Sequence, residues 1–284
     1  MNGVADKPGI TVTCFGLIGT LVADEGLVER SFAEAIATQG VVSGTSAFAR
    51  RMAQVHQARG RSADDVMRLL FPDNQARAQA AQLAFDRALA DAVGRLAIHP
   101  VPGAVRVLDQ LRAAGISVCV LTSLRRRVLD LVMDVADLGG HVDLALSADD
   151  VPRGFPAPDL VLMSILRTGA GSVGEVAVID DNGAGVEGGR RSGASIVAGV
   201  LTGPHPARRL RSAGATYILE TVAELPELVA AGDAAYQPDL AGAENGISCR
   251  MNPAQPEPPK SAQANGPSID VPAQVPFERR TSER

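Results

Sequence analysis

Short apolar runs alternate with amphipathic helical patterns along most of this 284-residue chain. Each run is bounded by glycine, proline or polar residues, and the longer segments between runs repeat apolar residues with a helical period. This alternation indicates a mainly parallel sheet with helices on both faces, a doubly wound α/β fold that binds ligands at the carboxyl ends of its strands. The predicted strands are Ile10–Phe15, Ile116–Leu121, Val142–Leu146, Glu175–Ile179, Ser195–Val200 and Thr216–Leu219. The predicted helices include Gly103–Ala114, Arg125–Asp137, Asp159–Thr168, Ala184–Ser192 and Pro206–Ala213.

One segment breaks the alternation. From Leu27 to about Leu96 the pattern is that of amphipathic helix alone, with no convincing strand. Because this segment directly follows the first predicted strand, we predict an all-helical cap, residues 23–96, inserted into the sheet domain. The sheet domain then comprises residues 10–22 and 97–232, and residues 1–9 form an N-terminal tail.

Residues 233–284 have a different composition. They hold eight of the 18 prolines and few large apolar residues, too few to offset the entropy of ordering a chain. We predict a disordered, proline-rich tail. A short partner-binding motif within DVPAQVPFERR is the alternative to a solvated linker.

Composition argues against several classes of protein. Aromatic residues make up 3% of the chain and its formal net charge is −5, which disfavours a nucleic-acid partner. No apolar run approaches the roughly 20 residues that span a bilayer, so we expect no membrane partner. The first residues lack a charged-then-apolar leader, and the three cysteines have no metal-ligand spacing. We therefore expect a cytoplasmic protein, with Cys14 and Cys119 as buried apolar residues of strands.

Four predicted strand ends carry polar or glycine-rich motifs. In chain order they are CFGLIGTLVADEGLVERSF, VCVLTS, SADDVPRGFPAPDL and VAVIDDNGAGVEGGRRSGA. Their order and spacing resemble the haloacid dehalogenase superfamily, whose members have a Rossmann-like fold, with a helical cap inserted after the first motif. The segments VADEGLVERSF, HPVPGA and GFPAPD are most similar to its phosphonatase-like branch.

The resemblance implies a reaction that this first motif does not support. Family members attack phosphorus with an aspartate that begins the loop, and Mg²⁺ neutralises charge around it. Alignment of Gly19 and Thr20 with the family's Gly-Thr places Gly16 at the nucleophile, and glycine has no side chain to attack with. Ile18 stands where phosphatases place an acid/base aspartate and phosphonatases an alanine.

The second and third motifs give candidate anion ligands. Thr122 is positioned to donate its hydroxyl, and the N–H groups of Ser123 and Leu124 are expected to open a helix that favours an anion. The alternative is that Thr122 only caps that helix. Phe155 replaces the family's cation, and Arg153 either swings in as a substitute or is a surface arginine.

The fourth motif keeps part of its acid. Asp181 matches the family's Mg²⁺-binding aspartate, Asp180 stands beside it, and Gly185 replaces the acid common four residues further on. Tight Mg²⁺ binding is therefore not expected, and a turn in which Asp180, Asp181 and Asn182 cap the next helix is the alternative.

True phosphonatases also form an imine through a cap lysine. The corresponding segment, GRSADDVMRLL, has Ser62 or a neighbour at that position. The chain's only lysines, Lys7 and Lys260, lie in the predicted tails, so no imine can form in the cap.

These losses favour a pseudoenzyme that retains the fold and binds a small anionic ligand or a protein partner, with no cofactor. The alternative is an active, Mg²⁺-dependent hydrolase of a small phosphonate or phosphorylated metabolite, similar to phosphonoacetaldehyde hydrolase or phosphoglycolate phosphatase. A third possibility is a partner-binding protein that uses the cap cleft or the tail.

Overall fold

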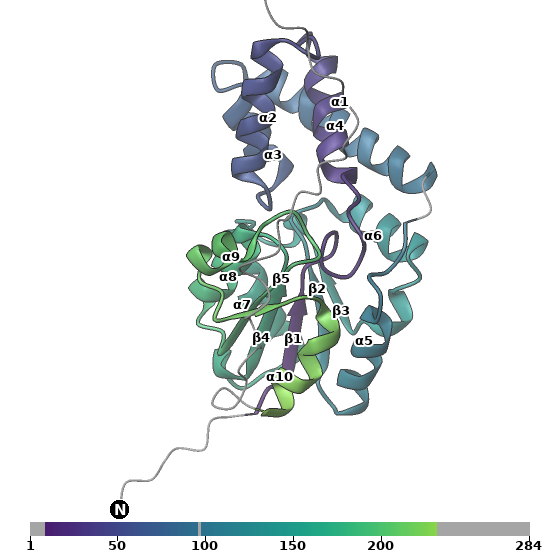
Figure 1. Cartoon of the computed structure of the whole chain (residues 1–284), viewed down its shortest axis with the longest axis vertical. Coiled ribbons are helices and arrows are strands. Elements are labelled where there is room, and N and C mark those ends of the chain that lie inside the picture. The colour runs from purple at the N-terminus through teal and green to yellow at the C-terminus, as the bar shows by residue number, and fades with distance from the viewer. Residues whose placement is uncertain (1–8, 96–97, 232–284) are drawn as a thin grey trace, which may run out of the picture. The chain divides into compact units, whose positions relative to one another are not determined.

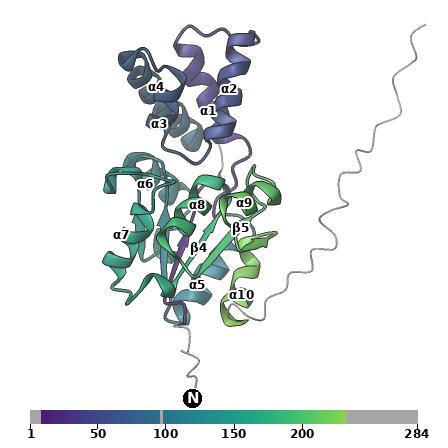
Figure 2. The same ribbon diagram turned by 90° about the vertical axis from the view of Figure 1, so that its left-hand side faces the viewer.

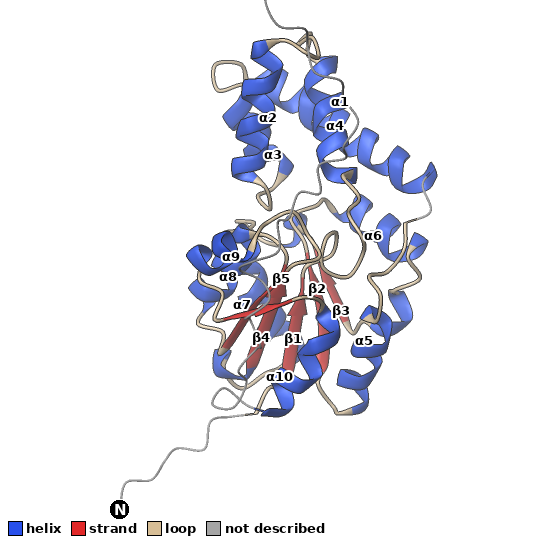
Figure 3. Ribbon diagram, in the orientation of Figure 1, coloured by secondary structure: helices blue, strands red, loops and turns tan. Residues whose placement is uncertain are grey.

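A six-stranded, all-parallel sheet forms the centre of the fold (Figure 3). The computed structural model describes residues 9–95 and 98–231. The strand order is β3-β2-β1-β4-β5-β6, so the first strand lies in the middle of the sheet. This arrangement confirms the predicted doubly wound α/β fold. The strands are β1 Val12–Phe15, β2 Ser117–Leu121, β3 Leu144–Leu146, β4 Val176–Asp180, β5 Ile196–Val200 and β6 Tyr217–Leu219.

Both faces of the sheet are covered by helices (Figures 1 and 2). Successive residues of a strand point to opposite faces, so Cys14 packs in the cluster of α7 whereas Phe15 packs with α5, α6 and α10. A strand buried on both sides reads as a continuous apolar run, which is why the strands were predictable. Helices α5 Ala104–Ala113, α6 Arg126–Val135 and α10 Leu225–Ala231 cover one face, and α7 Asp159–Thr168, α8 Gly183–Ser192 and α9 Ala207–Ala213 the other. Short 3₁₀ turns are Gly139–His141, Ala148–Asp150, Val173–Glu175 and Val222–Glu224.

Between β1 and α5 the described chain contains helices only. These are α1 Leu27–Thr38, α2 Ser46–Ala58, α3 Ala63–Leu70 and α4 Gln75–Arg95, which we call the helical insertion. Phe32 of α1 and Phe85 of α4 hold it together, with ring centroids 4.2 Å apart. The predicted helical character is confirmed, while a separate cap domain remains a prediction.

The predicted tails, residues 1–9 and 233–284, lie outside the described residues apart from residue 9. Among the described helices, none is both long and apolar enough to cross a membrane.

His205, in the loop after β5, ties that loop to the start of α8. Its Nδ1 accepts a hydrogen bond from the N–H of Gly183 at 2.9 Å, and its ring is buried. Burial, reinforced by the charges of Arg209 and Arg59, lowers the pKa of His205 to about 4. The folded protein therefore holds this imidazole neutral.

This burial predicts a pH-dependent stability. Below pH 6.5 His205 becomes protonated in the unfolded chain but stays neutral in the folded chain. The free energy of unfolding therefore falls between pH 6.5 and about 4. Relative to His205→Asn, whose amide oxygen can accept from Gly183, the wild type should lose on the order of 3 kcal/mol by pH 4. Urea midpoints across this range measure the difference, and parallel curves would contradict it. His99→Asn, at an exposed position, is the control.

Candidate functional site

The loop after β1 turns sharply at the carboxyl end of the sheet. Gly19 adopts φ 97°, in the left-handed region, and its N–H donates to the carbonyl of Val22 at 2.7 Å. A Cβ at Gly19 would collide with the Asp181 carboxylate. Thr20 Oγ1 donates to Asp181 Oδ1 at 2.8 Å and accepts from the Asp181 N–H at 3.1 Å. The first and fourth sequence motifs are therefore joined directly.

Gly16 and Ile18 both line a cavity at this edge of the sheet. A Cβ at Gly16 would lie 2.7 Å from Thr20 Oγ1 and 2.9 Å from Asp180 Oδ2. Position 16 thus lies at the cavity, and a larger residue there would require Thr20 or Asp180 to move.

Thr122 and Ser123 follow β2 and also line the cavity. Thr122 Oγ1 accepts from the Leu124 N–H at 3.2 Å, and Ser123 Oγ donates to the Gly60 carbonyl of the helical insertion at 2.6 Å. Because α6 begins only at Arg126, neither Thr122 nor the Ser123 and Leu124 N–H groups belong to its first turn. The predicted helix-terminal anion site is therefore wrong in that detail, and so is the alternative that Thr122 caps α6.

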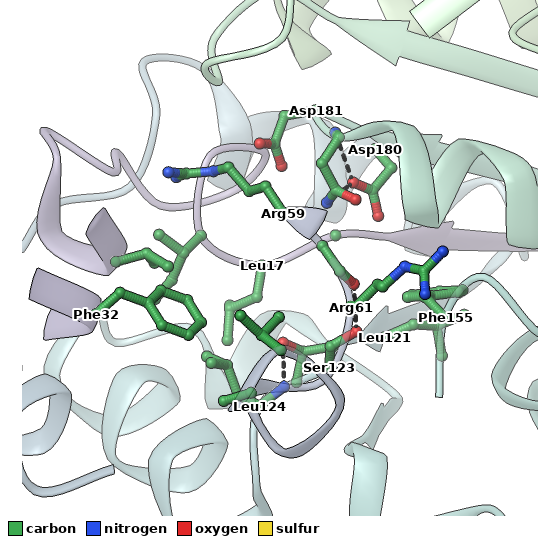
Figure 4. A pocket seen from close by; sticks show the side chains of 18 of the residues that line it. Leu17, Phe32, Arg59, Arg61, Leu121, Ser123, Leu124, Phe155, Asp180 and Asp181 are labelled. Carbon is green, nitrogen blue, oxygen red and sulfur yellow. Dashed lines mark hydrogen bonds between the residues drawn. The ribbon is translucent and has the colours of Figure 1, made fainter. Parts of the chain in front are cut away.

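Asp180 and Asp181 are both buried but point to different sides of the β4 end (Figure 4). Asp181 packs against Gly19 and Gly203, and Asp180 packs against Gly16 and Gly185.

The backbone and side chain of Asn182 both donate to Asp180 Oδ1, the backbone N–H at 2.9 Å. Asn182 Oδ1 accepts from the N–H groups of Ala184 and Gly185, at 3.1 and 3.0 Å. The alternative of a capping turn holds for Asn182 but not for the two aspartates.

Burial dominates the acidity of this pair. Burial raises the pKa of Asp180 well above its ordinary value, and the neighbouring Asp181 charge raises it further. Burial also raises the pKa of Asp181, to about 6, although the Thr20 hydrogen bond and the Arg59 charge oppose the shift. At neutral pH Asp181 is therefore mostly ionised, while burial disfavours the ionised form of Asp180.

These residues do not fit a magnesium ion. Mg²⁺ requires near-ideal octahedral oxygen geometry, and the two carboxylates diverge rather than converge on one point. Residues 9–95 and 98–231 contain no group of three or more His, Cys, Asp or Glu side chains that could hold a metal.

The cavity itself measures about 80 Å³, and residues of the helical insertion form part of its lining (Figure 4). Arg59, Gly60 and Arg61, which connect α2 to α3, line it. Neither arginine was predicted as a site residue, although both are visible in the pattern ARGRS of the sequence. Apolar side chains form the walls: Leu17, Ile18, Val28, Phe32, Ala63, Val66, Phe85, Leu121, Leu124 and Phe155.

Two predicted residues lie elsewhere. The Arg153 side chain is 71% exposed and binds both carboxylate oxygens of Asp159, at 2.8 and 3.1 Å, so its prediction as a cavity ligand is wrong. Ser62 caps α3 by accepting from the Asp65 N–H at 3.2 Å, and its neighbour Ala63 faces the cavity instead.

Cys14 lies away from the cavity lining, in an apolar cluster. Its Sγ is 3.2 Å from Ser164 Oγ. A hydrogen bond with Cys14 and burial together raise the pKa of Cys119. Both thiols are buried, and neither lines the cavity at the strand ends.

Comparison with known proteins identifies similar chains. A family model described as haloacid dehalogenase-like hydrolase matches residues 10–193. The phosphonoacetaldehyde hydrolase of Bordetella pertussis is 31% identical over 155 residues, covering 46% of this chain and 56% of that protein. That of Vibrio cholerae is 27% identical over 164 residues, covering 49% and 60%. The match thus spans little more than half the length of these relatives.

Solved structures agree with the fold. A phosphonoacetaldehyde hydrolase-like protein from Oleispira antarctica has a TM-score of 0.70 at 20% identity, covering 81% of this chain and 95% of that one. A hydrolase from Pseudomonas syringae has a TM-score of 0.67 at 24% identity, covering 76% and 97%.

The raised pKa of Asp181 predicts a second pH effect. Between pH 3.8 and about 6 the unfolded chain ionises this carboxyl while the folded chain keeps it protonated, so stability is lost as pH rises. Relative to Asp181→Asn, the wild type should lose on the order of 3 kcal/mol between pH 4 and 7. Urea unfolding of both proteins measures the difference, with Asp130→Asn on the exposed side of α6 as the control. A difference independent of pH would refute the assignment.

Proposed function

The chain belongs to the haloacid dehalogenase-like hydrolases, and we propose that it binds a small anion at its strand ends without forming an aspartyl-phosphate. The observation that carries this proposal is Gly16, which lines the cavity at the position of the family's nucleophile. Phosphoryl transfer by this family needs an attacking carboxylate, and Gly16 supplies none.

Several hydrogen-bond donors around the cavity support anion binding. Within the described residues, the backbone N–H groups of Leu17, Ile18 and Ser123 have no hydrogen-bond partner, and all three residues line the cavity. Thr122 Oγ1 accepts from Leu124 and keeps its own proton to donate. Arg61 lines the mouth, and its guanidinium makes no ion pair or hydrogen bond within the described chain. Unpaired N–H groups around a concave site favour anionic oxygens.

The other polar groups near Gly16 are already engaged. Thr20 is hydrogen-bonded to Asp181, and Ser123 Oγ donates to Gly60. Asp24 is ion-paired with Arg59. Asp180 Oδ1 accepts two hydrogen bonds from Asn182, and burial raises the pKa of Asp180, which disfavours the ionised form that a nucleophile needs. This engagement supports the loss of the covalent step.

The volume and the lining of the cavity also limit the size and chemistry of the ligand. A cavity of about 80 Å³ accommodates on the order of five waters, and hence an anion with only a few further atoms. Apolar walls favour a short carbon body next to the anionic group. A small phosphonate or phosphate monoester meets both requirements.

An active hydrolase is the second candidate. Its support is the name of the curated relatives, phosphonoacetaldehyde hydrolase, together with the placement of Thr122 and Asp181 at the cavity. This candidate requires an attacking group other than residue 16.

Binding can be tested with inorganic phosphate and methylphosphonate by isothermal titration calorimetry. Arg61→Met and Thr122→Val should each weaken binding about 10-fold or more, because each removes a donor to a charged oxygen. Arg153→Met is the matched control, since that arginine pairs with Asp159 and lies outside the cavity, and its affinity should equal that of the wild type. Equal loss in the control, or no binding by the wild type, would contradict the proposal.

Turnover separates the two candidates. With Mg²⁺ present, the wild type should release no phosphate from p-nitrophenyl phosphate or phosphonoacetaldehyde, and no phosphoenzyme should accumulate. Phosphate release that disappears in Asp181→Asn would support the hydrolase instead. The variant Gly16→Asp combined with Ile18→Asp restores both carboxylates of the family motif. If the wild type already releases phosphate and the double variant is no faster, the motif alignment is wrong.

A further inference from the structure

A buried arginine from the helical insertion reaches the strand ends. The Arg59 side chain is only 9% exposed and forms an ion pair with Asp24, whose side chain is equally buried. The charges of Arg59 and Asp24 both act on the Asp181 carboxyl group, and Arg59 runs beside Asp181 in Figure 4. The guanidinium is therefore ion-paired with Asp24, and its charge acts on Asp181 without a direct ion pair.

The backbone around Arg59 fixes this placement. Gly60 adopts φ 88°, and any Cβ there would overlap the Asn182 side chain. Ser123 Oγ donates to the Gly60 carbonyl at 2.6 Å, and Arg209 Nη2 donates to the Gln57 carbonyl at 2.8 Å. Contacts on both sides of Arg59 thus hold the α2–α3 connection against the sheet domain.

The buried carboxylates of Asp24 and Asp181 need a positive charge nearby, and Arg59 supplies it. A buried carboxylate without a counter-charge is strongly destabilising, and Asp24 is 8% exposed while Asp181 is 2% exposed. A divalent ion does not fit the diverging Asp180 and Asp181 carboxylates. The only other arginine that lines the cavity, Arg61, has no carboxylate partner among the described residues.

We propose that Arg59 is the resident cation of this site, supplying from within the chain the positive charge that a divalent metal would otherwise bring to Asp181. The folded wild type is then not expected to bind Mg²⁺ at the strand ends. Loss of the guanidinium would free Asp24 and Asp181, and one or two carboxylates completed by water are a common Mg²⁺ site. This inference does not depend on the proposed anion binding, because it concerns only the charge balance of the empty cavity.

Thermal unfolding of the full chain tests the proposal. At pH 7.5, 10 mM MgCl₂ should leave the melting temperature of the wild type unchanged relative to NaCl of equal ionic strength. Arg59→Met, which keeps the side-chain length without the charge, should melt lower and gain about 3 °C or more from MgCl₂, as expected for a site of roughly millimolar affinity. Equal ionic strength separates binding from screening.

Two further variants complete the experiment. Arg209→Met removes an arginine from the same boundary without exposing a buried carboxylate, so it should show no Mg²⁺ response. Asp24→Asn combined with Arg59→Met should recover stability and lose most of the Mg²⁺ response. A wild type stabilised by Mg²⁺, or an Arg59→Met protein indifferent to it, would overturn the proposal. If Arg59→Met is insoluble, the yield of folded protein after refolding with and without Mg²⁺ tests the same proposal. A higher yield with Mg²⁺ supports the proposal, and equal yields contradict it.

Discussion

The two hydrogen bonds between Thr20 and Asp181 are the contact on which the site depends. They join the loop after β1 to the loop after β4, and these strands are neighbours at the centre of the sheet. Because both partners are buried, neither group can exchange this contact for water without a cost in free energy. The contact also turns Asp181 away from Asp180, which leaves the two acids on separate sides and removes the convergent oxygens that a metal would require.

Much of the fold was predictable from the sequence because its signals are local. Except for β3, the strands are almost entirely buried, so they read as mainly apolar runs, and the strand boundaries differ from the predicted ones by at most two residues. The motif at each strand end then follows from topology, since parallel strands bring their carboxyl ends to one edge. Gly16, Ile18, Thr122, Ser123, Asp180 and Asp181 accordingly line one cavity.

Side-chain direction was harder to predict because it depends on partners distant in sequence. Arg153 was a candidate ligand by its position in the third motif, yet Asp159, six residues later, offers a closer carboxylate. Arg59 had no visible role until the fold brought it to Asp24, 35 residues away. Asp180 and Asp181 are adjacent in the chain, and the direction of each carboxylate depends on the glycines around it and on hydrogen bonds with Thr20 and Asn182. The prediction that Thr122 caps α6 failed because α6 begins at Arg126 and Arg125 occupies its N-cap position.

The packing of Asp180 over Gly185 limits what position 185 can hold. A Cβ there would lie 2.0 Å from Asp180 Oδ2, so a larger residue requires the Asp180 carboxylate to move. Any substitution at position 185 is therefore coupled to the side-chain direction of Asp180 and to the hydrogen bonds that Asp180 accepts from Asn182.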